Sequence, residues 1–140
     1  MTAHVYLAAS SSDLPRVRRW VRAIEAAGLT LSSRWFDDTG LGCDSALERE
    51  RQDEIANDCM MALAKSRIVW VLCPRSLVGG SLVELGMAIA FASFDRGRQV
   101  VVTGHGSHDT VFTGLRSVFR DPSDDVGFVE VVRLANGVRS

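Results

Sequence analysis

The sequence predicts an α/β fold, a three-layer doubly wound sandwich around a five-stranded parallel sheet in the flavodoxin-like order 2-1-3-4-5. Two observations lead to this fold class. Short apolar segments of strand length alternate with segments of helical length, which is typical of right-handed βαβ units. The segment at residues 68–73 (IVWVLC) is apolar at every position, as expected of a strand that helices cover on both faces. The 140 residues suit a single domain spanning 1–140.

The first half of the chain provides two of the strands and two of the helices. Residues 4–9 (HVYLAA) form a short apolar run, which we expect to be the first strand. Residues 13–27 carry apolar side chains at helical spacing and end before Gly28, which indicates an amphipathic helix. Residues 30–36 (TLSSRWF) predict the second strand. A Gly-containing loop at 37–44 precedes a long helix expected at 45–64.

The second half continues the alternation and locates the expected ligand site. Residues 68–73 are the third strand, 81–94 a helix, 99–103 the fourth strand and 128–132 (FVEVV) the fifth. Residues 105–125 form a connection for which no regular structure is predicted. In this topology ligands bind where the sheet reverses direction, over the carboxyl ends of strands one and three. The loops after those two strands should therefore form the site.

Composition and charge narrow the class of protein. The net charge of −1 provides no basic field for a nucleic acid polymer, and no apolar run approaches the roughly 20 residues that span a membrane. The first residues lack the pattern of a signal peptide. Cys43, Cys59 and Cys73 have no metal-site spacing, and buried thiols are expected. We therefore expect a cytoplasmic protein that acts on a small molecule and needs no cofactor or metal.

Glu84 is the residue that most strongly suggests chemistry. It follows Gly79, Gly80 and Ser81, and we expect it in the first turn of an otherwise apolar helix over the third strand. A carboxylate there could merely complement the helix dipole. Its place at the switch point of the sheet favours a functional role. The dipole and nearby N–H groups should keep it ionised, so that it could stabilise or trap the oxocarbenium-like sugar formed when an N-glycosidic bond breaks.

The residues expected to bind a substrate lie in the two loops. Ser10, Ser11 and Ser12 close the first strand and open the first helix, where hydroxyl and N–H groups suit a phosphate or a sugar hydroxyl. Simple helix capping explains these serines equally well. Gly79, Gly80 and Ser81 repeat this chemistry at the later helix, although a Gly-Gly pair alone is a weak signal.

For four further residues, a functional role has to be weighed against a structural or surface role. Asp58, on the long helix, is by itself a solvated charge. Trp35 could stack on a base or belong to the core. His105 and His108 form an HxxH pair, but no carboxylate or thiol pattern completes a metal site, so we expect them at the surface.

Three segments resemble the nucleoside 2-deoxyribosyltransferase superfamily: YLAAS at residues 6–10, the run at 57–66, and GGSLVELGMAIA at 79–90. The resemblance covers residues 5–102 in order and spacing. Residues 32–35 and the Val-Phe pair at 111–112 are similar to a compact subgroup associated with phages and actinobacteria. The resemblance implies cleavage or exchange of the base of a nucleoside or nucleotide, in a homo-oligomer whose subunits complete each other's sites.

The resemblance also implies roles for individual residues. Glu84 takes the place of the nucleophile, Asp58 that of an Asp that holds the sugar and base, and Ser81 that of a small hydroxyl residue. Val78 stands where the transferases have an Asp that acts on the base, and Thr110 where a neighbouring subunit usually lends an Asn. The nucleoside 5′-monophosphate N-hydrolase branch also lacks that Asp, and its phosphate-binding loop is similar to the serines here. Hydrolysis is therefore expected over transfer.

Two other functions remain open from the sequence. Residues 69–89 are similar to the strand, Ser loop and Glu helix of Toll/interleukin-receptor-like domains, whose enzymatic members cleave NAD. The Trp-Cys pair typical of that loop is missing here. Alternatively, the chain could be a non-catalytic nucleotide-binding or protein-interaction module that keeps only the fold.

Overall fold

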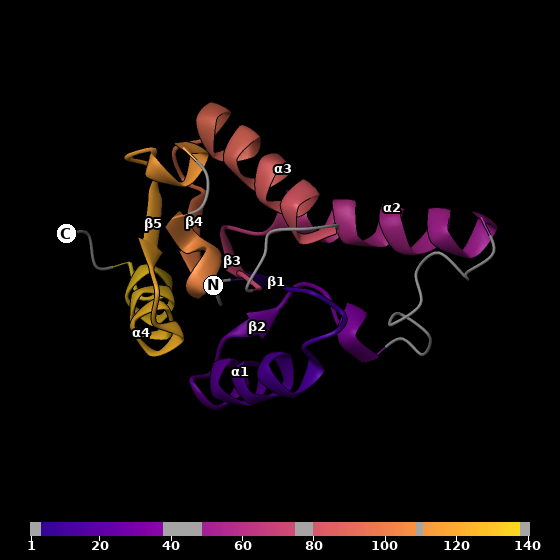
Figure 1. The fold of residues 1–140 in the computed structure, drawn as a ribbon, viewed down its shortest axis with the longest axis horizontal. Coiled ribbons are helices and arrows are strands. Elements are labelled where there is room, and N and C mark those ends of the chain that lie inside the picture. Colours follow the sequence, from indigo (N-terminus) through magenta and orange to yellow (C-terminus); the bar gives the residue numbers. More distant parts are fainter. Residues whose placement is uncertain (1–3, 38–48, 75–79, 109–110, 138–140) are drawn as a thin grey trace.

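The computed structural model describes residues 4–37, 49–74, 80–108 and 111–137. Five parallel strands form one sheet in the order β2-β1-β3-β4-β5, which confirms the predicted topology (Figure 1). The strands are β1 (His4–Ala8), β2 (Thr30–Leu31), β3 (Ile68–Leu72), β4 (Gln99–Thr103) and β5 (Val118–Asp121). The helices are α1 (Leu14–Ala26), α2 (Arg49–Lys65), α3 (Gly80–Phe94) and α4 (Asp124–Ala135), with short 3-10 turns η1 (Trp35–Asp37), η3 (His105–His108) and η4 (Val111–Gly114). Within the described residues, no helix combines the length and the apolar character needed to cross a membrane.

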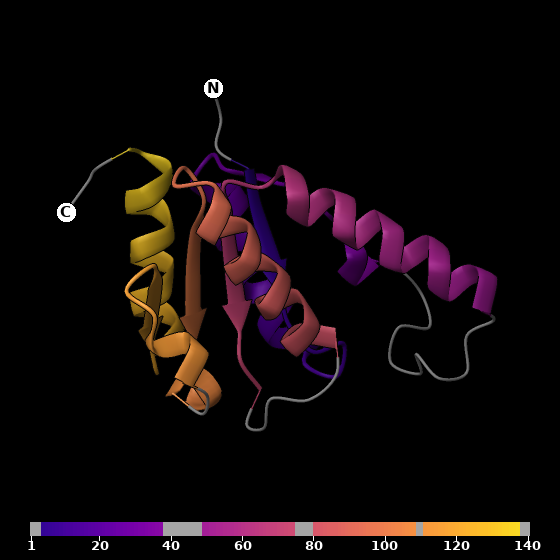
Figure 2. The same ribbon diagram turned by 90° about the horizontal axis from the view of Figure 1, so that it is seen from above.

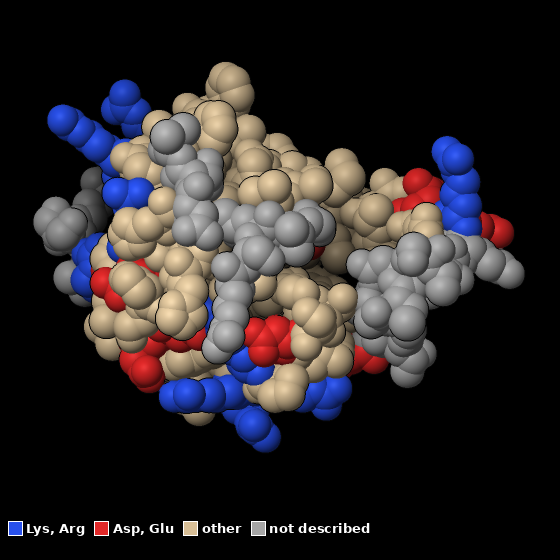
Figure 3. Space-filling model, viewed as in Figure 1, with Lys and Arg blue, Asp and Glu red and all other residues tan. Residues whose placement is uncertain are grey.

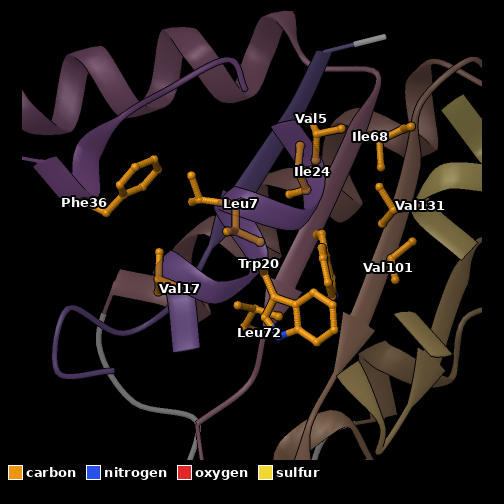
Figure 4. Close-up of a cluster of buried hydrophobic side chains, with 12 residues drawn as sticks. Val5, Leu7, Val17, Trp20, Ile24, Phe36, Ile68, Leu72, Val101 and Val131 are labelled. Atoms are coloured by element: carbon orange, nitrogen blue, oxygen red, sulfur yellow. The ribbon is translucent and has the colours of Figure 1, made fainter. Parts of the chain in front are cut away.

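The helices cover the two faces of the sheet in pairs. In Figure 1, α2 and α3 lie above the sheet and α1 and α4 below it, and Figure 2 shows α3 crossing the strands from above. Alternate residues of each strand supply the two cores, since successive side chains point to opposite faces. Val5 and Leu7 of β1 join the core under α1 and α4 (Figure 4), whereas Tyr6 and Ala8 join the core under α2 and α3. Strand β3 is buried at all five positions, as predicted for a central parallel strand.

The prediction of a fifth strand at residues 128–132 is wrong, because these residues lie inside helix α4. The hydroxyl of Ser123 accepts a hydrogen bond from the Val126 N–H, and Asp124 and Asp125 occupy the first helical turn. These capping signals override the strand preference of the valines that follow. The fifth strand is instead β5, inside the segment predicted as a connection.

The second strand is shorter than predicted. It pairs with β1 only at Thr30 and Leu31, and Ser32 then donates its backbone N–H to the Val5 carbonyl before the chain turns into η1. Burial of Phe36 draws this turn onto the core. Helix α2 extends one residue beyond its predicted end, and the first residues of that prediction, 45–48, lie outside the described residues.

Candidate functional site

The carboxyl ends of β1 and β3 lie side by side, with Ala8 paired to Val71, so the loops that follow these strands meet at one edge of the sheet. In the β1–α1 loop, the Ser10 and Ser12 hydroxyls are 2.7 Å apart, and the Ser12 N–H donates to Ser10 Oγ at 3.3 Å. None of the three serines caps α1: the N-cap residue is Asp13, whose side chain makes no capping bond. Ser10 and Ser11 are half-buried and Ser12 is exposed, so their hydroxyls line the edge of this region.

Glu84 lies in the second turn of α3, as its fifth residue, and not in the first turn as predicted. Ser81 precedes it by three residues, so both side chains lie on one side of the helix. Ser81 lies in line with Leu85 and Ala88, which pack on the sheet, and Glu84 lies at the edge of this stripe. Glu84 is therefore not placed to interact strongly with the N-terminal dipole, which falls off within the first turn, whereas Ser81 lies within that turn.

Three buried polar atoms in this region lack a hydrogen-bond partner within the described residues. They are the Tyr6 hydroxyl, Ser81 Oγ and Glu84 Oε2, and they are all the buried side-chain nitrogen or oxygen atoms of the described chain with this property. Tyr6 is fully buried on β1, and Ser81 is 3% exposed. A buried polar atom without a partner is rare in a folded protein and calls for an explanation, of which an absent ligand is one. The three atoms therefore mark the candidate site.

Burial controls the electrostatics of Glu84. It raises the pKa of the carboxyl group from 4.5 to about 7, and the nearby Tyr6 hydroxyl opposes this by stabilising the carboxylate. Burial also raises the pKa of Tyr6, as do the negative charge of Glu84 and the contact with Cys59. No hydrogen bond joins Tyr6 to Glu84 in this structure, although the two groups are close enough to affect one another. The expectation that Glu84 is held ionised is thus not met, because only part of it is ionised at neutral pH.

Helix α2 turns Cys59, and not Asp58, towards this site. Cys59 is half-buried, packs on the core beneath α2 and α3, and interacts with the Tyr6 hydroxyl. Asp58 is exposed on α2. Successive residues of a helix are about 100° apart, and on α2 Cys59 faces the core while the preceding residue, Asp58, faces solvent. The surface is hollowed between α2, α3 and the elements below them in the space-filling view (Figure 3).

Trp35 is held beside the end of β1. Its indole N–H donates to the Leu7 carbonyl at 2.7 Å, and the half-buried ring lies edge-on to Phe36 with centroids 5.7 Å apart. The ring also packs against both cores. These contacts give Trp35 a structural role, and stacking on a base stays a prediction.

Of the other residues singled out in the sequence, some have a defined position in the structure and some lie outside the described residues. Gly80 opens α3, whereas Val78, Gly79, Thr110 and Cys43 lie outside the described residues. His105 and His108 are exposed, as expected, and Cys73 is buried, with 1% of its surface exposed. Among the described residues, no group of three or more His, Cys, Asp or Glu side chains could hold a metal ion.

The opposite side of the same sheet edge holds a second carboxylate in a contrasting environment. Here a depression of about 630 Å³ is bordered by α1, α4 and the ends of β3 and β4. Arg16 donates from Nε and Nη2 to the two oxygens of Asp124 at 2.6 and 2.8 Å, and from Nη1 to the Cys73 carbonyl at 2.7 Å. Trp20 Nε1 and Thr103 Oγ1 also donate to Asp124, at 3.2 and 2.7 Å.

Asp124 is thus fully hydrogen-bonded where Glu84 is not. Although burial acts to raise the pKa of Asp124, the hydrogen bonds from Arg16 and Thr103 hold it below its ordinary value. A satisfied carboxylate of this kind fastens helices α1 and α4 to the strand ends. Of the two carboxylates, Glu84 is the one in an environment typical of reactive groups.

No protein-family model matches the chain, and no curated protein matches it by sequence. Among solved structures, the chain is similar to the CMP N-glycosidase BcmB of Clostridium botulinum, with a TM-score of 0.57 and 12% sequence identity. The match covers 91% of this chain and 96% of that one. At this identity the likeness shows a shared fold. It confirms the fold expected from the resemblance to the nucleoside 2-deoxyribosyltransferase superfamily.

Proposed function

We propose that this protein cleaves the N-glycosidic bond of a nucleoside or nucleoside 5′-monophosphate, with Glu84 as nucleophile and with hydrolysis as the main outcome. The observation that carries the proposal is the buried Glu84 carboxyl, whose Oε2 has no partner, beside the unpartnered hydroxyls of Tyr6 and Ser81 at the switch point of the sheet. The fold shared with a protein described as a CMP N-glycosidase supports this choice of reaction.

The chemistry proceeds in two displacements. The ionised Glu84 attacks the anomeric carbon as the bond to the base breaks, and a glycosyl ester forms on the carboxylate. The base leaves with the electron pair of the broken bond and takes up a proton from water. Water then attacks the same carbon, releases the sugar and regenerates Glu84. Tyr6, which keeps its proton, can donate to the carboxylate as charge returns to it. A carboxyl pKa of about 7 leaves a substantial fraction of Glu84 ionised at neutral pH.

The remaining residues bind the substrate around this carboxylate. The hydroxyls of Ser10, Ser11 and Ser12 and the N-terminus of α1 hold the 5′-phosphate or a sugar hydroxyl, which their position on the β1–α1 loop supports. Ser81 contacts the sugar from the first turn of α3, which begins at Gly80. Trp35 borders the base, whereas Asp58, on the exposed side of α2, does not face this carboxylate.

The protein acts as a homo-oligomer in this proposal, with a second copy covering α2 and α3. Helix α3 contains Glu84 as its only ionisable residue, and a helix that is apolar on all sides is normally buried. Helix α2 extends away from the sheet in Figure 1, and only Leu63 of its 17 residues is buried. Exposed apolar side chains follow both helices: Met60, Met61, Leu82, Val83 and Phe94. A multimer by analytical ultracentrifugation that Val83→Lys converts to monomer supports this assembly, and a monomeric wild type contradicts it.

The experiment that tests the function is release of free base from a panel of ribo- and deoxyribonucleosides, their 5′-monophosphates and NAD. The purified protein is expected to release base from a nucleotide, and Glu84→Gln to abolish release while remaining folded. Glu50→Gln, which changes an exposed carboxylate on α2, serves as the matched control and is expected to retain activity. Release from NAD alone would favour the Toll/interleukin-receptor-like activity. Tight nucleotide binding without any product would favour a binding module.

A further inference from the structure

Cys59 is the residue through which α2 reaches the Glu84 site. The inner side of α2 carries Ile55, Cys59 and Leu63 at four-residue spacing, and of these Cys59 interacts with the Tyr6 hydroxyl. The same hydroxyl interacts with Glu84. The thiol, the phenol and the carboxyl group therefore gather around one point, with contributions from α2, β1 and α3.

Cys59 and Cys73 differ in solvent exposure, which is one of the properties that decide the reactivity of a thiol. Cys59 is half-buried at the edge of the core, whereas only 1% of Cys73 is exposed. Part of Cys59 is therefore in contact with solvent, whereas Cys73 is enclosed in the core. Beside Cys59 lies the fully buried Tyr6 hydroxyl, which has no hydrogen-bond partner, so the thiol adjoins a polar space and not a sealed apolar one.

We propose that Cys59 is a modification site in the wall of the Glu84 site, which takes small disulfides by thiol–disulfide exchange, and that the bound group blocks access to Glu84. In this step the Cys59 thiolate attacks one sulfur of the disulfide. A new S–S bond to Cys59 forms as the original S–S bond breaks, the departing sulfur leaves as a thiolate, and the proton that Cys59 has lost goes to solvent. A reducing thiol reverses the exchange. The inference depends on the proposed function only in assigning a reaction to the site that is blocked.

The charge of Glu84 should affect the rate at which Cys59 is modified, and this rate can be measured without a substrate. Glu84 and Cys59 both act on the Tyr6 hydroxyl, and like charges repel strongly in a partly buried region. An ionised Glu84 disfavours the attacking thiolate. At pH 8, Glu84→Gln is expected to accelerate modification of Cys59 several-fold, whereas Glu50→Gln leaves the rate unchanged.

The test uses 5,5′-dithiobis(2-nitrobenzoate), an aromatic disulfide that releases a coloured thiolate on exchange. In a Cys43→Ser background only Cys59 and Cys73 remain of the three cysteines. The native protein is expected to release one equivalent of colour, and the Cys43→Ser, Cys59→Ala variant none. Unfolding in guanidinium should add one equivalent in each case, from Cys73. CMP should slow the exchange, and the modified protein should lose nucleotide binding and base release until dithiothreitol restores both.

The results separate this inference from the proposed function. Colour from Cys59 only after unfolding, a rate unchanged in Glu84→Gln, or full nucleotide binding by the modified protein would each overturn the inference. Exchange at Cys59 that Glu84→Gln accelerates and that abolishes nucleotide binding supports it, even if no base is ever released. In that event the proposed function fails alone.

Discussion

Replacing Glu84 by Gln should make the protein more stable at pH 8. Burial raises the pKa of the Glu84 carboxyl from 4.5 to about 7, so the folded state holds its proton more tightly than the unfolded chain does. A raised pKa contributes stability that is fully present below about pH 4.5 and is lost as the pH rises through about 7. Above pH 7 the folded protein must keep a buried carboxylate.

The magnitude follows from the same pKa values. A change from 4.5 to about 7 corresponds to about 3 kcal/mol between the two protonation states. Glutamine keeps the shape of the protonated carboxyl and cannot ionise. The free energy of unfolding of the variant should therefore exceed that of the wild type by up to about 3 kcal/mol at pH 8, and most of this difference should disappear at pH 5.

Urea unfolding at pH 5 and pH 8 measures this difference directly. Asp58→Asn is the matched control, because it removes an exposed carboxylate and should change stability little at either pH. A Glu84→Gln variant that is no more stable than the wild type at pH 8 would refute the reasoning. So would a gain of equal size at both pH values, since it could not arise from ionisation.

Two further predictions concern packing and the pH dependence of turnover. Gly86→Ala should stabilise the protein by about 1 kcal/mol, because Gly86 is exposed in α3 with no atom within 4 Å of an added Cβ. Gly127→Ala should destabilise it by about 1–2 kcal/mol, because the added Cβ would lie 2.3 Å from Thr103 Cγ2. Thermal unfolding of the two variants checks this opposite sign, and equal shifts would contradict it. Base release should rise with pH through about 7 as Glu84 ionises, and Tyr6→Phe should move this rise to higher pH by removing the hydroxyl group that lowers the pKa of Glu84. An unmoved pH profile would show that the hydroxyl does not act on the carboxylate.

Much of the fold could be predicted because its central strands are apolar at every position. The segment that forms β3, and the apolar run of β4, admit few alternatives once helical segments alternate with them. The helix at residues 128–132 could not be predicted in the same way, because its sequence FVEVV has the composition of a strand. Its structure is decided by Ser123 and the two aspartates that follow, and by the packing of Gly127 against Thr103. Capping and tertiary contact there outweigh the preference of the valines.

The site could be predicted only where a motif marks it. Glu84 follows the sequence Gly-Gly-Ser, and the topology brings it to the switch point. The contributions of Tyr6 and Cys59 could not be foreseen. A Tyr in an apolar strand is indistinguishable from a core residue, and the inward direction of Cys59 depends on how α2 is rotated against the sheet. The raised pKa of Glu84 follows from this packing, which no sequence pattern encodes.

The central claim, that Glu84 attacks the sugar of a nucleotide, is tested most directly by trapping the glycosyl ester. The protein is quenched in acid during turnover of CMP, digested, and the peptide that contains Glu84 is measured by mass spectrometry. The account predicts a sugar phosphate attached to Glu84 in the wild type, with neither the adduct nor free cytosine from Glu84→Gln. Cytosine release by Glu84→Gln at the wild-type rate, with an unmodified peptide in both proteins, would contradict it.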